Sequence, residues 1–426
     1  MTPDKSVLDP SALSLYNLLD PAVLANPYSL YKNLRENDPV HWDPFLHAWV
    51  ATRYEDVIQI MLKFSADRTP TPEQLDAMGM MAEMSPIAQV MVKQMLFMDA
   101  PAHTRLRALC ATAFTPARVA VLKQHIQDIA DQLIDKVLPS GQMDVIADFA
   151  NPLPAIVTAE LFGVPVEDHQ DLKNWSTDFA EMLGNFQLNP DRARGVLQST
   201  ENMLAYFQNA IRDQERNPRP GLVQSLMQAE VEGSRLTEEE IVANLIVTMV
   251  GGQETTTNLI GNGLVSLLRN PDQLALLKND SSILPSAIEE LLRYESPSQH
   301  TARLAPADTM LGGKLIKKRQ AVIAVFAAAN RDPERFADPD KLDLRRTDNR
   351  HVAFAWGAHY CFGAPLARME GQIAFETMLR RLPNLRLHEQ EFQWRENMGL
   401  RGLKSLKVSF DKPPKDETPQ NDGAAS

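Results

Sequence analysis

One of the two cysteines lies in a segment whose residue types suit a reactive or metal-binding thiolate. Residues 354–363 read Phe-Ala-Trp-Gly-Ala-His-Tyr-Cys-Phe-Gly. We expect a loop that delivers Cys361 to the start of a helix, where backbone N–H groups and the helix dipole favour an anion and lower the pKa of the thiol. Gly357 and Gly363 let the backbone approach a flat partner closely. Such a thiolate could be a nucleophile, a redox thiol or a metal ligand, and these residues alone do not decide between them.

The other cysteine has a different setting. Cys110 lies in an apolar stripe with Leu106, Leu109 and Ala113, so we expect it to pack in a helical core. Two cysteines in 426 residues are too few for a disulfide scaffold.

A second chemically unusual segment interrupts a long apolar run. Residues 251–256 read Gly-Gly-Gln-Glu-Thr-Thr. Adjacent glycines inside a helix cost about 1 kcal/mol each relative to alanine, and threonine hydroxyls compete for backbone carbonyls. A buried helix should avoid this combination unless the distortion is used. Glu254 and Thr255 are therefore candidate catalytic residues, and the alternative is a kinked but purely structural helix.

Helices must position both segments. Thr237 and Glu240 form a capping box ahead of an apolar run that Pro271 stops, which predicts a helix over about 238–270. Such a helix is roughly 50 Å long and should be central and buried. The other expected elements are strands at 40–42 and 48–52, a helix from about 285 to before Pro297, a hairpin-like stretch at 309–324, and a helix at about 365–381.

The whole chain limits the possible functions. Its length exceeds the usual size of one core, but no repeat or linker divides it, so we expect one catalytic domain over 1–411 and a disordered tail over 412–426. The net charge of −12 argues against a nucleic-acid partner. We find no signal peptide and no apolar run of about 18 residues, and so predict no membrane span and a cytoplasmic location.

Two motifs identify the sequence as resembling the cytochrome P450 family. Phe-x-x-Gly-x-His-x-Cys-x-Gly at 354–363 resembles its haem-binding loop, and Gly-Gly-x-Glu-Thr at 251–255 resembles its oxygen-activation motif. One departure is Ala355, where the family usually has glycine. The resemblance covers about 38–410 and is strongest to the soluble bacterial branch that includes macrolide and terpenoid hydroxylases. It implies a mainly α fold with a small β region, a single triangular domain around buried haem b (iron protoporphyrin IX).

The resemblance also assigns roles to the residues of both motifs. Cys361 would be the axial ligand of the haem iron. Thr255 would hydrogen-bond the bound dioxygen, and Glu254 would pass protons to it from solvent. Gly251 would leave space above the iron.

Two further groups of residues match the family by position. A buried haem needs cations for its two propionates, and the resemblance assigns that role to His103, Arg107, Arg303 and His359. The pair Glu290 and Arg293, three residues apart on one helix face, matches a structural Glu-x-x-Arg motif. Arg346 is the expected third partner of that pair.

Substrate contacts follow only from family position. The predicted pocket residues are Met78, Met81, Met84, Val250, Ser298, Thr301 and Leu400. This mixture predicts a mostly apolar small molecule, such as a polyketide, a terpenoid, a steroid or a fatty acid, either free or tethered to a carrier protein.

The expected activity is hydroxylation of that molecule by a monooxygenase with a role in secondary metabolism. Because no flavin-like or ferredoxin-like region is appended, electrons would come from a separate ferredoxin or flavodoxin with its reductase. We expect a monomer. The alternatives are a peroxide-driven haem enzyme, oxidation by epoxidation, desaturation or ring coupling, and a non-catalytic haem sensor. Glu254-Thr255 argues against the peroxide-driven class, whose members usually carry Arg-Pro there.

Overall fold

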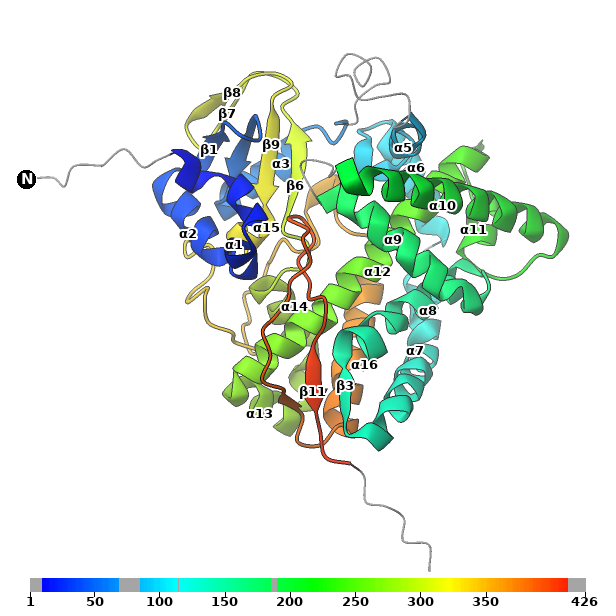
Figure 1. Ribbon diagram of the computed structural model, residues 1–426. Coiled ribbons are helices and arrows are strands. Elements are labelled where there is room, and N and C mark those ends of the chain that lie inside the picture. The colour runs from blue at the N-terminus through cyan, green and yellow to red at the C-terminus, as the bar shows by residue number, and fades with distance from the viewer. Residues whose placement is uncertain (1–9, 69–84, 114, 185–189, 413–426) are drawn as a thin grey trace, which may run out of the picture.

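The computed structural model describes residues 10–68, 85–113, 115–184 and 190–412. Figure 1 shows a triangular outline with helices over most of its area and a small sheet region at one corner. The mainly α fold with a small β region is confirmed. The division into a domain over 1–411 and a tail stays a prediction, since 413–426 lie outside the described residues. The α-helices are α1 (Pro21–Ala25), α2 (Tyr28–Asn37), α3 (Tyr54–Lys63), α5 (Ser85–Met91), α6 (Ala102–Ala113), α7 (Pro116–Val137), α8 (Pro152–Phe162), α9 (His169–Gly184), α10 (Pro190–Arg216), α11 (Leu222–Gln228), α12 (Glu238–Arg269), α13 (Pro271–Asn279), α14 (Leu284–Tyr294), α15 (Phe326–Ala329) and α16 (Ala364–Arg381).

The long helix forms as predicted. Thr237 caps α12, its hydroxyl accepting from the Glu240 amide while the Glu240 carboxylate accepts from the Thr237 amide. Pro271 begins the next helix, because proline suits a first helical turn but cannot continue the one before it. Helix α12 crosses the middle of the molecule, and apolar cores pack against it from both sides.

The main sheet has four strands in the order β1 (Val40–Asp43), β2 (Ala48–Ala51), β9 (Ala321–Val325) and β6 (His300–Leu304). Strand β9 is parallel to β2 and antiparallel to β6. In the smaller three-stranded sheet, β11 (Lys407–Ser409) pairs with β10 (Arg386–Leu387) on one side and β3 (Gln142–Asp144) on the other. Two further pairs are β4 (Glu230–Val231) with β5 (Ser234–Arg235), and β7 (Thr309–Leu311) with β8 (Lys314–Ile316).

The predicted hairpin over 309–324 is wrong in its second half. The hairpin is β7–β8 and ends at Ile316, while residues 321–325 leave it and enter the main sheet. The physical reason is burial, because residues 322–325 are fully apolar and buried and therefore suit an interior strand. The predicted helix before Pro297 is confirmed as α14, and the predicted terminal helix is confirmed as α16.

The predicted structural triad forms. Arg293 Nη2 lies 2.7 Å from Glu290 Oε1, and both side chains are fully buried. Arg346 Nε lies 3.1 Å from Glu290 Oε2. Arg293 also donates to the carbonyls of Asn330 and Pro339. The triad therefore ties α14 to the irregular segment that leads to the cysteine loop.

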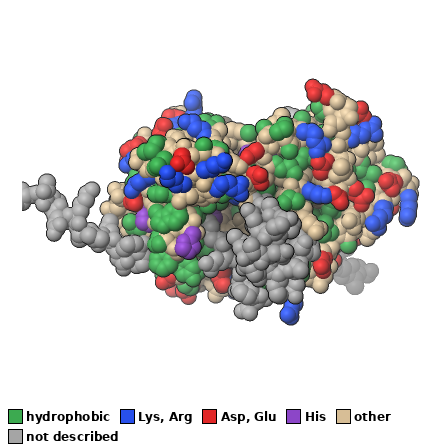
Figure 2. Space-filling view, turned by 90° about the horizontal axis from the view of Figure 1, so that it is seen from above, with side chains coloured by type: hydrophobic (Ala, Val, Ile, Leu, Met, Phe, Trp, Pro, Cys, Tyr) green, Lys and Arg blue, Asp and Glu red, His purple; other side chains and the backbone are tan. Residues whose placement is uncertain are grey.

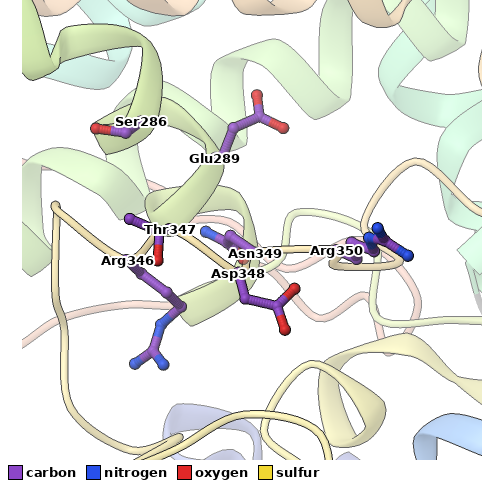
Figure 3. Close-up of a pocket in the computed structure, with 7 residues that line it drawn as sticks. All are labelled: Ser286, Glu289, Arg346, Thr347, Asp348, Asn349 and Arg350. Carbon is purple, nitrogen blue, oxygen red and sulfur yellow. The ribbon is translucent and has the colours of Figure 1, made fainter.

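A surface pocket of about 440 Å³ lies beside this triad (Figure 3), between Ser286 and Glu289 of α14 and residues 346–350. Its carboxylates already have partners, since Glu289 binds Arg368 and Asp348 binds Arg335. The residues of this pocket therefore belong to the ion pairs that hold the fold together around the triad, and we assign the pocket no ligand.

The surface seen from above mixes basic, acidic and apolar side chains (Figure 2). Among the described residues, no helix is long and apolar enough to cross a membrane.

Candidate active site

A cavity lies between the middle of α12, the start of α16, strand β6 and the cysteine loop. The predicted site residues that line it are His103, Arg107, Val250, Gly251, Thr255, Ser298, Thr301, His359, Cys361 and Leu400. Segments far apart in the sequence therefore converge on one space. Met78, Met81 and Met84 lie outside the described residues.

The cysteine loop folds tightly before α16. The Cys361 amide donates to the Phe354 carbonyl at 2.9 Å, and the Ala364 amide donates to the Cys361 carbonyl at 3.4 Å. Burial by the surrounding protein raises the pKa of the Cys361 thiol, while the Gly363 and Ala364 amides lower it. The amides at the start of α16 therefore act on this thiol in the predicted direction, and their balance with desolvation sets its pKa. An adjacent metal cation would reverse that balance.

Ala355, which departs from the family pattern, adopts an unfavourable backbone conformation. Ala355 has φ +61° and Gly357 has φ +69°, both in the left-handed region. Glycine adopts this conformation freely, while alanine is strained in it. The loop keeps its shape with Ala355 because the Ala355 amide donates to the Val352 carbonyl at 2.9 Å and the Cys361 amide closes the turn.

Basic side chains gather at one end of the cavity. The imidazole rings of His103 and His359 lie 4.1 Å apart between centroids. Burial, followed by the charges of Arg303 and His103, lowers the pKa of His359 to about 3. Burial lowers the pKa of Arg303 to about 10, with Asp99 acting in the opposite direction. Burial and mutual repulsion therefore disfavour the charged forms of the basic side chains in this cluster.

Arg68 is a further member of this cluster that was not predicted from the sequence. Arg68 lines the cavity, and its guanidinium lies 4.6 Å from the centroid of the Phe97 ring. Burial, together with the charge of Arg303, lowers the pKa of Arg68 to about 9. Arg68 precedes a Thr-Pro-Thr-Pro segment and matches no motif, so its role could not be predicted from the neighbouring residues. Arg105, by contrast, pairs with Glu240 and is not among the residues that line the cavity.

Glu254 and Thr255 are adjacent on α12, but only Thr255 is among the residues that line the cavity. The Thr255 hydroxyl faces the cavity and donates to the Gly251 carbonyl at 2.6 Å. That bond shares its carbonyl with the helical hydrogen bond, and α12 nevertheless continues as an α-helix through residues 251–256. A Cβ at Gly251 would meet nothing within 4 Å, so this position leaves open space.

Glu254 is buried and ion-paired on both oxygens. Its Oε1 contacts Lys173 of α9 and accepts from the Thr177 hydroxyl at 2.8 Å, and its Oε2 lies 2.5 Å from Arg395 Nη1. Burial alone would raise the pKa of Glu254, but the charges of Lys173 and Arg395 outweigh it and lower the pKa. Glu254 is therefore held as a carboxylate. Neither partner could be found from the sequence, because both come from distant segments without a motif.

The remaining lining of the cavity is mostly apolar. Val250 and Leu400 face it, together with the less apolar Ser298 and Thr301. Other apolar lining residues include Met95, Leu96, Leu161, Phe162, Leu183 and Val247.

Cys110 is buried in α6 and packs in the adjacent core, which confirms the prediction for it.

Comparisons with known proteins agree with this architecture. Residues 76–405 match the family model "Cytochrome P450". The biotin biosynthesis cytochrome P450 of Bacillus subtilis is 37% identical over 392 residues, which span 91% of this chain and 97% of that protein. The polyketide biosynthesis cytochrome P450 PksS of the same organism is 36% identical over 401 residues, 91% of this chain and 96% of that protein.

A solved structure of P450BioI in complex with hexadec-9Z-enoic acid ligated acyl carrier protein superposes with a TM-score of 0.86. It is 36% identical and covers 92% of this chain and 99% of that chain. A fold of this kind around such a cavity defines the class of haem-dependent monooxygenases. The chain belongs to the cytochrome P450 family, and the cofactor of that family is haem.

The residues present fit a haem. His103 Nε2 is buried without a hydrogen-bond partner among the described residues, and Arg303 and Arg68 are buried cations that repel one another. Buried cations and donors of this kind need an anion. Two carboxylates entering the cavity would meet that need, and haem carries two propionates.

Proposed function

We propose that this protein uses haem, dioxygen and electrons from a separate protein to hydroxylate a mostly apolar small molecule in its cavity. The observation that carries the proposal is the convergence of Cys361, Thr255 and the basic side chains of Arg68, His103, Arg107 and His359 on one cavity with apolar walls. We assign Cys361 as the axial ligand, with His103, Arg107, Arg303, His359 and Arg68 as partners of the propionates.

The proposed substrate is an acyl or polyketide chain. The apolar lining beside Val250 and Leu400 suits hydrocarbon, and the hydroxyls of Ser298 and Thr301 can orient an oxygen-bearing group. Relatives named for biotin and polyketide biosynthesis, and a solved relative bound to an acyl carrier protein, support this class. We further propose that the chain can be presented while tethered to a carrier protein.

Bound haem supplies the redox chemistry that activates dioxygen, favoured by the thiolate. In this proposal the Thr255 hydroxyl stands in the cavity as a hydrogen-bond donor and acceptor for the reacting oxygen. Glu254 lies one residue away and would exchange protons with solvent water beside its partner Arg395, whose side chain is 20% exposed and whose guanidinium stays charged throughout. The apolar walls exclude water, so protons would arrive only through such polar groups.

The proposed electron donor is a ferredoxin or flavodoxin. The cysteine loop reaches the surface at Tyr360, which is 37% exposed. Arg107 donates to the Tyr360 carbonyl at 2.5 Å, and Arg368 donates to its hydroxyl at 3.1 Å. The exposed Tyr360 marks the part of the surface where a donor protein would lie near Cys361.

The test begins with the purified holoprotein. Reduction under carbon monoxide should give the thiolate-type Soret band, which should be lost in Cys361→Ser and kept in the control Cys110→Ser. Hexadec-9Z-enoic acid, free and tethered to an acyl carrier protein, should be oxidised with NADPH, ferredoxin and ferredoxin reductase. Oxidation with peroxide alone would indicate the peroxide-driven class, and retention of the band in Cys361→Ser would refute the ligand assignment.

A further inference from the structure

A helical turn with π geometry lies close to the proposed proton relay. The π-helical turn (Ile146–Ala150) follows β3, precedes α8 and packs against α12. The Asp144 carboxylate accepts from its first amide, that of Ile146, at 3.0 Å. The Asn151 amide closes the turn by donating to the Ile146 carbonyl at 2.9 Å, across the i→i+5 spacing of a π-helix. Such turns are frequent at functional sites, and no step of the proposed mechanism uses this one.

The end of the turn is tied to α12. Because Pro154 has no N–H, the Ala150 carbonyl cannot receive the usual helical hydrogen bond from the residue four positions further on. The hydroxyl of Thr257, a fully buried residue of α12, donates to this carbonyl instead at 2.8 Å. Thr257 follows Glu254 by three residues and therefore lies on a neighbouring part of the same helix face.

Asn151, the residue directly after the turn, faces the relay. Its Oδ1 lies 3.4 Å from Arg395 Nη2, while Arg395 Nη1 lies 2.5 Å from Glu254 Oε2. The two terminal nitrogens of the guanidinium thus have different partners. Glu254, Arg395, Asn151 and Thr257 form a closed ring of contacts that begins and ends on α12.

We propose that the π-helical turn positions the relay: through Asn151 it holds Arg395 against the carboxylate of Glu254. The inference rests on the proposed monooxygenase function, in which Glu254 exchanges protons with solvent. The additional residue of the turn decides where Asn151 points, because each residue rotates a helix by about 100° around its axis. With one residue fewer, Asn151 would face away from Arg395.

An asparagine suits this position because it is neutral. Its amide oxygen accepts from a guanidinium without neutralising the charge, so the charge of Arg395 stays directed at Glu254. A carboxylate at position 151 would instead compete with Glu254 for the same cation. Lys173 and Thr177 of α9 hold the other oxygen of Glu254. Asn151 is therefore a positioning residue that acts through Arg395.

The first experiment compares pH–rate profiles for oxidation of hexadec-9Z-enoic acid with NADPH, a ferredoxin and its reductase. Asn151→Leu keeps a side chain branched at Cγ but removes the acceptor, so the limb that reports Glu254 should shift to higher pH. The shift should be smaller than in Arg395→Gln, and the double variant should shift no further than Arg395→Gln alone. The control Asn209→Ala removes a similar contact, with Arg212 on the exposed side of α10, and should keep the wild-type profile. A wild-type profile in Asn151→Leu would overturn the proposal.

Two variants test the turn itself. Deletion of Ala147, an exposed residue of the turn, shortens it by one residue, and Thr257→Val releases the Ala150 carbonyl without a change of size. Both should shift the same limb in the same direction as Asn151→Leu. If the deletion variant does not fold, Thr257→Val decides, and an unchanged profile in Thr257→Val would refute the role of the turn.

A readout that does not depend on activity is the urea unfolding of the holoprotein in a double-mutant cycle of Asn151→Leu and Arg395→Gln. Because both changes remove the same contact, the effect of the double variant on the unfolding constant should differ about twofold or more from the product of the single effects. Independent effects would overturn the contact. If wild type does not oxidise the probe, the proposed substrate class fails, whereas this cycle still tests Asn151.

Discussion

The guanidinium of Arg395 lies 2.5 Å from the carboxylate of Glu254, although 141 residues separate them in the chain. This contact joins the C-terminal segment to the middle of α12. Together with Lys173 it neutralises a carboxylate that burial would otherwise protonate. The protonation state of the proposed proton relay is therefore set by residues outside its motif.

Removal of one cation should move the pH dependence of turnover. In Arg395→Gln the Glu254 anion loses part of its stabilisation, so the pKa of Glu254 should rise. The limb of the pH–rate profile that reports Glu254 should then shift to higher pH, as measured by NADPH-driven product formation. Arg192→Gln, which breaks ion pairs with Glu181 and Glu396, is the control and should leave the profile unchanged. Identical profiles for Arg395→Gln and wild type would exclude this relay.

Loss of the Thr255 hydroxyl should increase the amount of peroxide formed per NADPH consumed. Thr255→Ala should keep haem content and substrate binding but release most of its reducing equivalents as peroxide, because the cavity loses the hydroxyl that stands beside the reacting oxygen. Thr255→Ser keeps the hydroxyl and should stay coupled. The measurement is peroxide per NADPH, and a fully coupled alanine variant would contradict the role.

Arg68 should contribute to haem retention. Arg68→Leu removes a buried cation at the basic end of the cavity, so haem should transfer to apomyoglobin several-fold faster than from wild type. Arg107→Leu should act in the same direction. Arg105→Leu is the control, since Arg105 pairs with Glu240 away from the cavity. Equal transfer rates for Arg68→Leu and the control would remove Arg68 from the propionate set.

The pair of Glu289 and Arg368 should stabilise the fold in a pH-dependent way. Burial would raise the pKa of Glu289, but Arg368 and His351 outweigh it and lower the pKa to about 2. A depressed native pKa adds stability that is present above the usual pKa of about 4.5 and is lost as the pH falls toward 2.

Glu289→Gln should therefore lower the free energy of unfolding at pH 7 by about 1–2 kcal/mol, a figure reduced for partial solvent exposure. The difference should shrink below pH 4.5 in urea titrations. Glu376→Gln, an exposed site on α16, should have no comparable effect. A difference that is constant from pH 7 to pH 3 would show that lost packing, and not charge, is responsible.

The strained alanine of the cysteine loop offers a stabilising change. Ala355→Gly should relieve the left-handed conformation and raise the free energy of unfolding by up to about 1 kcal/mol, after the entropy cost of glycine. Ala367→Gly, inside α16, should instead cost about 1 kcal/mol. Urea unfolding of the two variants should therefore give opposite signs, and destabilisation by both would contradict the strain.

Local patterns were enough to predict much of this protein. The capping box at Thr237 and the proline at 271 set the ends of α12 because capping and proline geometry act within one turn. The spacing of Glu290 and Arg293 fixed one helical pair for the same reason. The haem-loop pattern around Cys361 placed the family, since the loop needs specific residue types at specific positions.

Only the tertiary structure decided what surrounds those residues. Arg68, Lys173 and Arg395 reach the site from three separate segments, and nothing in their neighbouring residues marks them. Burial and charge depend on distances in space, which is why cations far away in the chain hold the buried Glu254 as an anion. The same dependence acts on the thiol of Cys361, whose pKa desolvation raises and the amides of Gly363 and Ala364 lower.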